Sequence, residues 1–348
     1  MNYPAVKSDF SLVLTHPSLR GRIATRLVRV VVKRWARGDP PAVVRRARRV
    51  FGLPNFMNTL YSLGLKVEPV DTAIVRGEWV QPRKCPSHDR VVLYLHGGGY
   101  VSCSPKTHRP ITTTLARMLG CPVLSLDYRL APEHPYPAAV DDAASAFQWL
   151  CENGVRPENI AMIGDSAGGG LALATIYRLR AQGNALPACV VGLSPWVDLT
   201  GEDSYRNSGS CSMFQPSDIA VFARIYLGQA SAETPEASPC FGDLGGLPPL
   251  LTQVSSTELL LDDALRLHEK ARSVGVKSTL SVYPGLPHVW QILFGLIPEA
   301  RLALEEVASF IFEAWFLPAH PTAERGRTQD RRPNTVATQA FNREDRTT

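Results

Sequence analysis

The spacing of hydrophobic residues changes repeatedly along the chain, and the changes predict alternating strands and helices. Short unbroken apolar runs, such as residues 91–95 and 189–193, are typical of strands buried on both faces of a sheet. Longer segments, such as residues 138–151 and 299–315, repeat their apolar residues every three or four positions, as helices with one buried face do. The pattern therefore predicts an α/β protein with a mostly parallel sheet covered by helices on both faces.

The same reading gives the individual elements. Eight strands are predicted, at residues 66–70, 73–80, 91–95, 123–127, 160–164, 189–193, 250–255 and 279–283. Helices are predicted at residues 110–119, 138–151, 167–182, 217–227, 262–274 and 299–315. Another helical and amphipathic stretch covers residues 18–62, with breaks at 39–41 and near 52–54 where prolines interrupt the pattern.

The pattern also divides the chain. Regular alternation extends over residues 61–317, which predicts one large domain. Inside it, residues 196–246 are irregular and rich in glycine, proline and serine, apart from the predicted helix at residues 217–227. The tail, residues 318–348, is polar, charged and aperiodic, which predicts disorder.

Charge adds one feature to this picture. The net charge is only +5, but basic residues crowd the segment from Arg20 to Arg49, where Asp39 is the only acid. We interpret this cluster as the solvated face of amphipathic helices and expect no nucleic-acid partner. A weak contact with an anionic membrane surface stays open.

Cysteines and the N-terminus point to a cytoplasmic location. The chain does not start with a basic segment and a long apolar run, so no signal peptide is predicted, and residues 23–35 are too short and too charged to span a bilayer. The seven cysteines are scattered, without a C-x-x-C pair or zinc-ligand spacing. We expect reduced thiols, no metal and no cofactor.

A nucleophile motif lies between a predicted strand and a predicted helix. Residues 164–168 read Gly-Asp-Ser-Ala-Gly and match G-x-S-x-G. In a nucleophile elbow the serine occupies a strained strand-to-helix turn, and small neighbours let the elements pass closely. A glycine-rich turn without catalysis is the alternative, but the strand–turn–helix setting favours Ser166 as the nucleophile.

A glycine-rich loop follows the third predicted strand and consists of His96, Gly97, Gly98 and Gly99. Backbone N–H groups without side chains around them suit an oxyanion, which has to be met by donors already in position. A phosphate-binding loop is the alternative, but no lysine or helix N-cap pattern follows. We expect Gly98, Gly99 and Ala167 to donate to the oxyanion, and His96 to orient the loop.

These motifs resemble the hormone-sensitive-lipase-like group of α/β-hydrolases, the bacterial type IV esterases. The matching segments are residues 96–100 (HGGGY), 127–133 (DYRLAPE), 141–142 (DD), 164–169 (GDSAGG) and 283–288 (YPGLPH). They stand in family order and at family-like spacing between about residues 65 and 315. The resemblance implies an α/β-hydrolase fold and short- to medium-chain acyl esters as substrates. It also implies a helical cap, built here from residues 1–60 and 200–245.

His288 is predicted as the general base by its position and by the resemblance. It follows the last predicted strand in a Gly-Leu-Pro loop, and α/β-hydrolases place nucleophile, acid and histidine in this order along the chain. The remaining histidines lack such a setting: His16, His88, His108, His134, His268 and His320.

The segment that should carry the acid of the triad departs from the commonest pattern of the family. Many relatives carry Asp-Pro-Leu-x-Asp, whose first aspartate orients the histidine, whereas residues 258–262 here read Glu-Leu-Leu-Leu-Asp. We predict Glu258 as the acid, since glutamate is an accepted triad acid in this fold. Asp262 is the alternative, although it also suits the first turn of the following helix.

The remaining polar and aromatic residues near the motifs divide into two groups. We interpret residues 127–133 as a structural turn in which Arg129 and Glu133 pair beneath the active-site loops. The candidates for the substrate pocket are Tyr100, Asp165, Trp196, Met213, Phe214 and Trp290, with Phe51, Met57 and Tyr226 as further cap residues. Core packing is the alternative for each of them.

The predicted function is hydrolysis of a small-molecule carboxylic ester through an acyl-enzyme. A lactone hydrolase with the same residues stays open. So does a ligand-binding protein that keeps the fold without the chemistry, although such proteins usually lose part of the triad. A peptidase is disfavoured because nothing in the sequence suggests a site for a peptide end. The oligomeric state is left open, a homodimer included.

Overall fold

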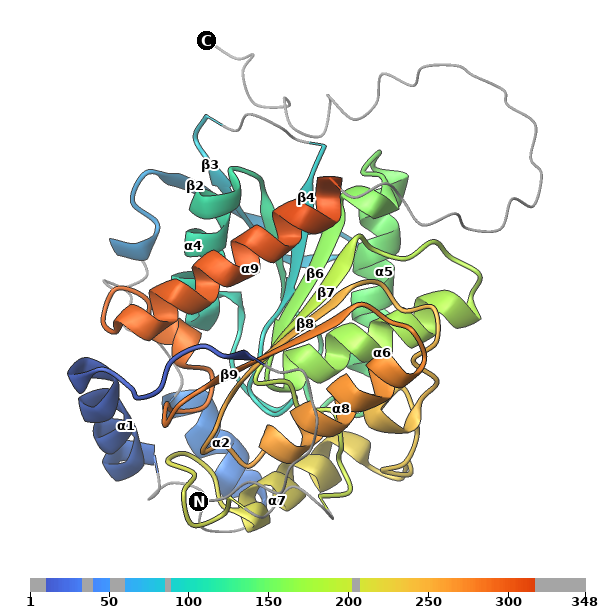
Figure 1. Ribbon diagram of the computed structural model, residues 1–348. Helices are drawn as coiled ribbons and strands as arrows, with labels where there is room; N and C mark the ends of the chain where they lie inside the picture. The colour runs from blue at the N-terminus through green and yellow to red at the C-terminus, as the bar shows by residue number, and fades with distance from the viewer. Residues whose placement is uncertain (1–10, 33–39, 51–59, 85–88, 202–206, 317–348) are drawn as a thin grey trace, which may run out of the picture.

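A nine-stranded sheet forms the centre of the molecule (Figure 1). The computed structural model describes residues 11–32, 40–50, 60–84, 89–201 and 207–316, and the strand order is β1-β9-β8-β7-β6-β4-β5-β3-β2. The strands are β1 (Ser11–Leu12), β2 (Leu65–Asp71), β3 (Arg76–Pro82), β4 (Val91–Leu95), β5 (Val123–Leu126), β6 (Ile160–Asp165), β7 (Cys189–Leu193), β8 (Leu250–Ser255) and β9 (Ser278–Tyr283).

The predicted α/β-hydrolase sheet is present, with one additional strand. All pairs from β1 to β5 in the spatial order are parallel, and β3 pairs antiparallel with both β5 and β2. The eight strands predicted from the sequence all occur, within a few residues of their predicted ends. Strand β1 was not predicted, because a two-residue strand at the sheet edge is too short to show a period of two.

Helices cover both faces of this sheet. Figure 1 shows α4 (Arg109–Leu119) and α9 (Pro298–Phe316) on one face, and α5 (Ala138–Glu152), α6 (Ala167–Ala181) and α8 (Leu261–Ser273) on the other. Successive side chains of a strand point to opposite faces. Accordingly, Val92 and Tyr94 belong to the buried cluster under α4 and α9, and Leu93 and Leu95 to the larger cluster under α5 and α6.

Three further helices gather at the end of the sheet where the parallel strands finish. They are α1 (Leu19–Val32), α2 (Pro40–Val50) and α7 (Pro216–Leu227), seen at the bottom of Figure 1. They come from the two segments expected to form a cap. Parts of those segments, including Phe51 and Met57, lie outside the described residues, as does the tail predicted to be disordered.

None of the described helices combines the length and the apolar character that a membrane-crossing helix requires.

The predicted pairing of Arg129 with Glu133 is wrong. Arg129 instead binds Asp142 on α5 at 2.7 Å, and Glu133 binds Arg48 on α2 at 2.6 Å. Arg48 also donates from Nε to the carbonyl oxygen of Val101 at 2.8 Å. The turn at residues 127–133 therefore connects α2 and α5 to the loop after β4.

Candidate active site

Ser166 occupies the turn between β6 and α6 in a strained backbone conformation. Its φ is 52° and its ψ is −121°, a region that residues with a side chain rarely adopt. The turn is held by hydrogen bonds from the Ser166 N–H to the Leu193 carbonyl and from the Trp196 N–H to the Ser166 carbonyl, both 2.9 Å. A Cβ at Gly164 would lie 2.0 Å from the Gly168 carbonyl oxygen, so only glycine allows strand and helix to approach this closely. This geometry is that of a nucleophile elbow.

The glycine loop after β4 lies beside Ser166. Gly98 has a φ of 114°, and a Cβ there would lie 2.2 Å from the Ser102 carbonyl oxygen, so this position requires glycine. Gly98 and Gly99 both line the cavity that also contains Ser166. Ala167 is the first residue of α6 and has a buried side chain. Its N–H is among the first four of the helix, which have no intrahelical acceptor.

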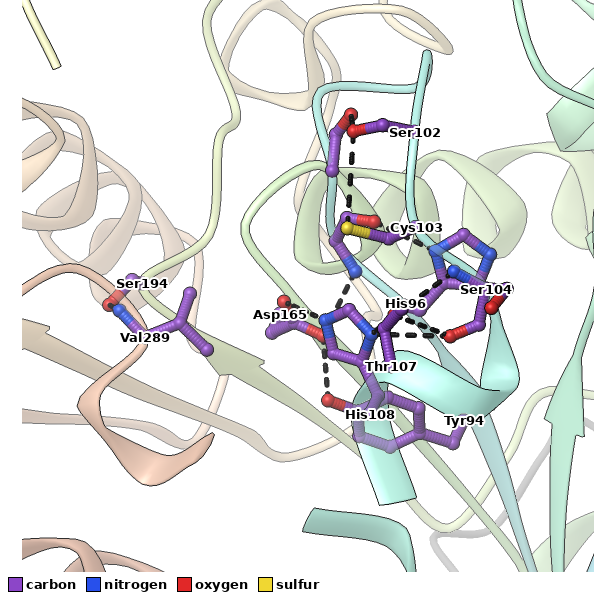
Figure 2. Close-up of polar contacts among 12 residues, drawn as sticks. Tyr94, His96, Ser102, Cys103, Ser104, Thr107, His108, Asp165, Ser194 and Val289 are labelled. Carbon is purple, nitrogen blue, oxygen red and sulfur yellow. Dashed lines mark hydrogen bonds and ion pairs between the residues drawn. The ribbon is translucent and has the colours of Figure 1, made fainter. Parts of the chain in front are cut away.

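A buried carboxylate connects the elbow to this loop. Figure 2 shows Asp165 surrounded by donors: its Oδ1 accepts hydrogen bonds from the Tyr94 hydroxyl at 2.6 Å and from the Gly97 N–H at 3.0 Å. The second oxygen, Oδ2, lies 3.1 Å from Nε2 of His108. Burial opposes the charge, but His108 and the hydrogen bonds outweigh it, so the pKa of Asp165 lies below its usual value. A charged Asp165 thus anchors the first glycine of the loop.

His96 packs within the loop and stays uncharged. Its ring stacks on Tyr128, with the ring centroids 4.3 Å apart, and its Nδ1 lies 2.7 Å from the Gly97 carbonyl oxygen, to which it donates. Complete burial, with a contribution from His108, lowers the pKa of His96 to about 3. These contacts hold the His96 ring within the loop, and its role in orienting the loop stays a prediction.

His288 and Glu258 form a buried pair. Nδ1 of His288 contacts Oε2 of Glu258, while Oε1 of Glu258 accepts hydrogen bonds from the Ser194 hydroxyl at 2.7 Å and the Ser255 N–H at 2.8 Å. Because a carboxylate can only accept, Nδ1 of His288 is the donor in this contact, and in the neutral imidazole Nε2 is then the acceptor. Within the described residues that Nε2 is buried and has no hydrogen-bond partner. The alternative acid, Asp262, lies in the first turn of α8.

Ser194 supports this pair and was not found from the sequence. It follows β7 with a φ of 49°, and besides donating to Glu258 its hydroxyl oxygen accepts a hydrogen bond from the Val289 N–H at 3.3 Å (Figure 2). One hydroxyl therefore links the acid to the residue after His288. A serine after a strand is common, so no sequence pattern identified it.

A single cavity of about 140 Å³ brings these groups together. It contains Ser166, His288 and the loop glycines, and of the predicted pocket residues Asp165, Trp196, Met213 and Phe214 line it. Further lining residues were not predicted: Cys103, Thr107, His108, Ile219, Phe222, Leu260, Val289 and Ile292. The cap segment before and within α7 thus supplies much of the apolar wall. In this wall the ring of Phe214 lies edge-on to the ring of His288, with the ring centroids 5.3 Å apart.

Two predicted pocket residues, Tyr100 and Trp290, are core residues instead. Tyr100 is 1% exposed and stacks on Tyr226 with the ring centroids 3.7 Å apart. Trp290 is fully buried against Tyr283 at 4.8 Å. Tyr226, in the cap helix α7, is held by the same stacking and does not line the cavity, so it is not a pocket residue. Packing of aromatic rings against each other, rather than contact with a ligand, explains these positions.

His108 is a residue of the site that the sequence did not identify. It ends the short helical turn Pro105–His108, lines the cavity and faces Asp165, which lies 57 positions later in the chain. Only the fold brings the two residues together. A local sequence pattern has no means of detecting such a contact.

Comparison with known proteins shows which family the chain belongs to. A family model described as the alpha/beta hydrolase fold matches residues 92–292, which include Ser166, Glu258 and His288. The chain belongs to the α/β-hydrolase family. An acetyl-hydrolase of Streptomyces hygroscopicus is 41% identical to this hydrolase over 252 residues, which cover 71% of this chain and 84% of that protein.

Similar solved structures show to which group of the family the chain belongs. An esterase from the bacterial hormone-sensitive lipase family matches with a TM-score of 0.78 and 38% identity, covering 86% of this chain and 99% of that chain. The esterase EstE5, in a crystal soaked with p-nitrophenyl butyrate, matches with a TM-score of 0.77 and 38% identity over the same shares of the two chains. This α/β-hydrolase is therefore a serine esterase of the hormone-sensitive-lipase group.

Proposed function

We propose that this α/β-hydrolase cleaves short- to medium-chain acyl esters with Ser166 as nucleophile, His288 as base and Glu258 as acid. The observation that carries the proposal is the arrangement around one cavity. Ser166 lies on a strained turn, and both Ser166 and His288 line this cavity. Nδ1 of His288 contacts Glu258, and its Nε2 is buried without a hydrogen-bond partner among the described residues. An oriented imidazole and a serine hydroxyl that line the same cavity are the groups that nucleophilic catalysis requires.

The reaction follows from these roles. Nε2 of His288 takes the proton from the Ser166 hydroxyl as its oxygen attacks the ester carbonyl carbon. The backbone N–H groups of Gly98, Gly99 and Ala167 stabilise the oxyanion that forms. His288 then gives its proton to the departing alcohol, which leaves an acyl group on Ser166. Water activated by His288 hydrolyses this acyl-enzyme and restores the free hydroxyl.

Glu258 acts through His288. Its carboxylate keeps the proton on Nδ1, so that Nε2 is free to accept a proton from Ser166, and it stabilises the imidazolium that forms during the attack. The hydrogen bonds from Ser194 and Ser255 fix Oε1 of Glu258, which leaves Oε2 for His288. Ser194 is a positioning residue in this scheme.

The preference for short acyl groups is supported by the size and lining of the cavity. Its volume of about 140 Å³ is close to the roughly 150 Å³ that holds benzene in an engineered protein cavity. Its walls are mostly apolar, with Ile219 and Phe222 on the cap side and Leu260 and Ile292 on the domain side. The soak of the similar esterase EstE5 with a butyrate ester points to the same class of substrate.

A fluorophosphonate probe followed by an ester panel tests the proposal. The probe should label the wild-type protein but not Ser166→Ala, and the variant should lose on the order of 10³-fold or more of the esterase rate. p-Nitrophenyl esters of increasing acyl length, with lactones in parallel, then define the substrate class. A folded Ser166→Ala protein that keeps a tenth of the wild-type rate would overturn the assignment of Ser166 as nucleophile. If lactones are hydrolysed faster than the p-nitrophenyl esters, the enzyme is a lactone hydrolase instead.

A further inference from the structure

Helix α1 carries an exposed apolar stripe. Five of its residues, Leu19, Ile23, Leu27, Val30 and Val31, are 70%, 47%, 60%, 66% and 63% exposed. At 3.6 residues per turn these positions fall on one side of the helix. Single exposed apolar residues are ordinary, but a contiguous stripe of them marks an interaction surface.

The opposite side of α1 is already fixed to the hydrolase domain. The Ser18 N–H and hydroxyl donate to the buried carboxylate of Glu299 at 2.5 and 3.0 Å, and the Thr25 hydroxyl donates to the Gly285 carbonyl at 3.1 Å. A Cβ at Gly21 would touch Glu299 and Leu286, so the helix backbone lies directly on its neighbours. Rotating α1 to bury its apolar stripe would break all these contacts. The stripe therefore faces outward.

The apolar surface continues beyond the helix. Leu296, in the loop before α9, is 57% exposed and lines one surface depression together with Leu19, Arg20 and Arg301. The stripe on α1 and this leucine thus form one surface, which we call the α1 face. It consists of Leu19, Ile23, Leu27, Val30, Val31 and Leu296.

Arginines border the α1 face. Arg22, Arg26 and Arg29 are exposed and follow one edge of the apolar stripe, and one nitrogen of Arg29 also donates to the Ser210 carbonyl. Neither α1 nor α2 contains an acidic residue. Figure 1 shows α2, which adds the exposed Arg45 and Arg49, at the same end of the molecule. An apolar stripe flanked by arginines is the pattern of helices that lie in the interface of an anionic bilayer.

We propose that the α1 face docks on an anionic lipid surface. Lipid accepts both parts of the face, because acyl chains bury the apolar stripe while phosphate groups meet the arginines. A second copy of the chain is a poorer match. A two-fold contact through this face would bring the same arginine-bordered surface of each copy against the other, without acids on either helix to neutralise it.

Docking in this orientation would place the proposed active site near the lipid. Gly285 and Leu286, which contact α1, come two to three residues before His288 in the same loop. Helix α1 lies at the same end of the sheet as α7, which supplies Ile219 and Phe222 to the wall of the cavity. The enzyme would then meet apolar esters at the surface where they accumulate. This consequence depends on the proposed function, but the docking itself does not.

Vesicle co-sedimentation of the full chain tests the docking. We expect binding to vesicles of equal parts phosphatidylglycerol and phosphatidylcholine, and weak or no binding to pure phosphatidylcholine. Binding should fall as salt rises to about 1 M, where the screening length is only about 3 Å. Ser166→Ala should bind as the wild type does, so failure of the catalytic assignment would leave this result intact.

Two double variants and one control separate the contributions of the apolar residues and of the arginines to vesicle binding. Ile23→Glu/Leu27→Glu should reduce binding about 10²-fold or more, because both apolar side chains leave the membrane and charges repel it. Arg22→Gln/Arg26→Gln, which leaves the apolar stripe intact, should reduce binding to the anionic vesicles by about 10-fold or more. The control is Ile74→Glu, in the turn between β2 and β3 at the other edge of the sheet, where isoleucine is 54% exposed. It should bind like the wild type.

The proposal is overturned if the wild type does not bind anionic vesicles, or if Ile74→Glu is as defective as the two α1 variants. Sedimentation equilibrium tests the alternative that the α1 face binds a second copy of the chain. If the wild type is a dimer that Ile23→Glu/Leu27→Glu converts to a monomer, the α1 face is a self-association surface and not a lipid surface. Thermal melts confirm that each variant is folded, and the arginine variant provides the test if the glutamate variant is not.

Discussion

The carboxylate of Asp165 accepts a hydrogen bond from the Gly97 N–H at 3.0 Å, so the residue before the proposed nucleophile fixes the start of the oxyanion loop. The same oxygen accepts the Tyr94 hydroxyl at 2.6 Å, and the other oxygen faces His108. The position of Gly98 and Gly99 relative to Ser166 therefore depends on a side chain that does not react. Asp165 is a positioning residue in this arrangement.

Asp165→Ala and Asp165→Asn should separate positioning from simple stability. The alanine variant loses the acceptor for Gly97, so kcat should fall about 10²-fold, the cost of weakening one oxyanion donor, while KM changes little. The asparagine variant keeps an acceptor oxygen for Gly97 and should recover most of kcat. Steady-state kinetics well below the melting temperature of each variant provide the measurement. Equal kcat in the two variants would contradict the positioning role.

His96 should make the protein less stable in acid. Its pKa in the fold is about 3, against about 6.5 for an unfolded histidine, so between these values the unfolded chain binds the proton and the folded chain does not. Stability contributed by neutral His96 is therefore present above about pH 6.5 and is lost progressively as pH falls toward 3, by about 1.4 kcal/mol for each pH unit.

Urea unfolding of wild type and His96→Gln at a series of pH values from 7 to 4 checks this expectation. The variant should be less stable at pH 7, because it loses the stacking on Tyr128, but its stability should depend less on pH. Parallel pH dependences in the two proteins would show that His96 is not the group that titrates.

Phe222 should limit the length of the acyl group. It is 5% exposed, lines the cavity from α7 and packs over Gly99, where a Cβ would lie 3.1 Å from its ring. Phe222→Ala should enlarge the cavity and raise the ratio of kcat/KM for hexanoate over acetate esters several-fold, at a cost of about 3 kcal/mol in stability. Phe147→Ala, in the same buried cluster but away from the cavity, is the matched control. It should lose similar stability and leave the ratio unchanged.

Some parts of this structure can be predicted from the sequence, and others depend on contacts that only the fold creates. The strands and the setting of Ser166 depend on local patterns, namely apolar runs and small residues around a turn, and these are visible in a single sequence. The position of His108 against Asp165 and the partners of Arg129 and Glu133 depend on which distant elements the fold brings together. Tyr100 and Trp290 look the same in sequence whether they pack in the core or line a cavity, since both places favour large apolar rings.

Glu258 and Asp262 can be distinguished by one pair of variants. Oε1 of Glu258 accepts hydrogen bonds from Ser194 and Ser255, so a glutamine that keeps its oxygen there must present its NH₂ group to His288. An NH₂ donor forces Nδ1 to act as acceptor and moves the ring proton to Nε2, the atom that should take the proton of Ser166. Glu258→Gln should therefore lower kcat by roughly 10²- to 10⁴-fold while the fold is kept.

Asp262→Asn is the matched control, because the same charge is removed four residues further along. Asp262 lies in the first turn of α8, where a carboxylate complements the helix dipole, so its loss should cost a few tenths to about 1 kcal/mol in stability and little activity. Kinetics and thermal melts of the two variants are measured together. If Asp262→Asn is inactive and Glu258→Gln is healthy, then Glu258 does not orient His288 during catalysis, and the acid has to come from the first turn of α8.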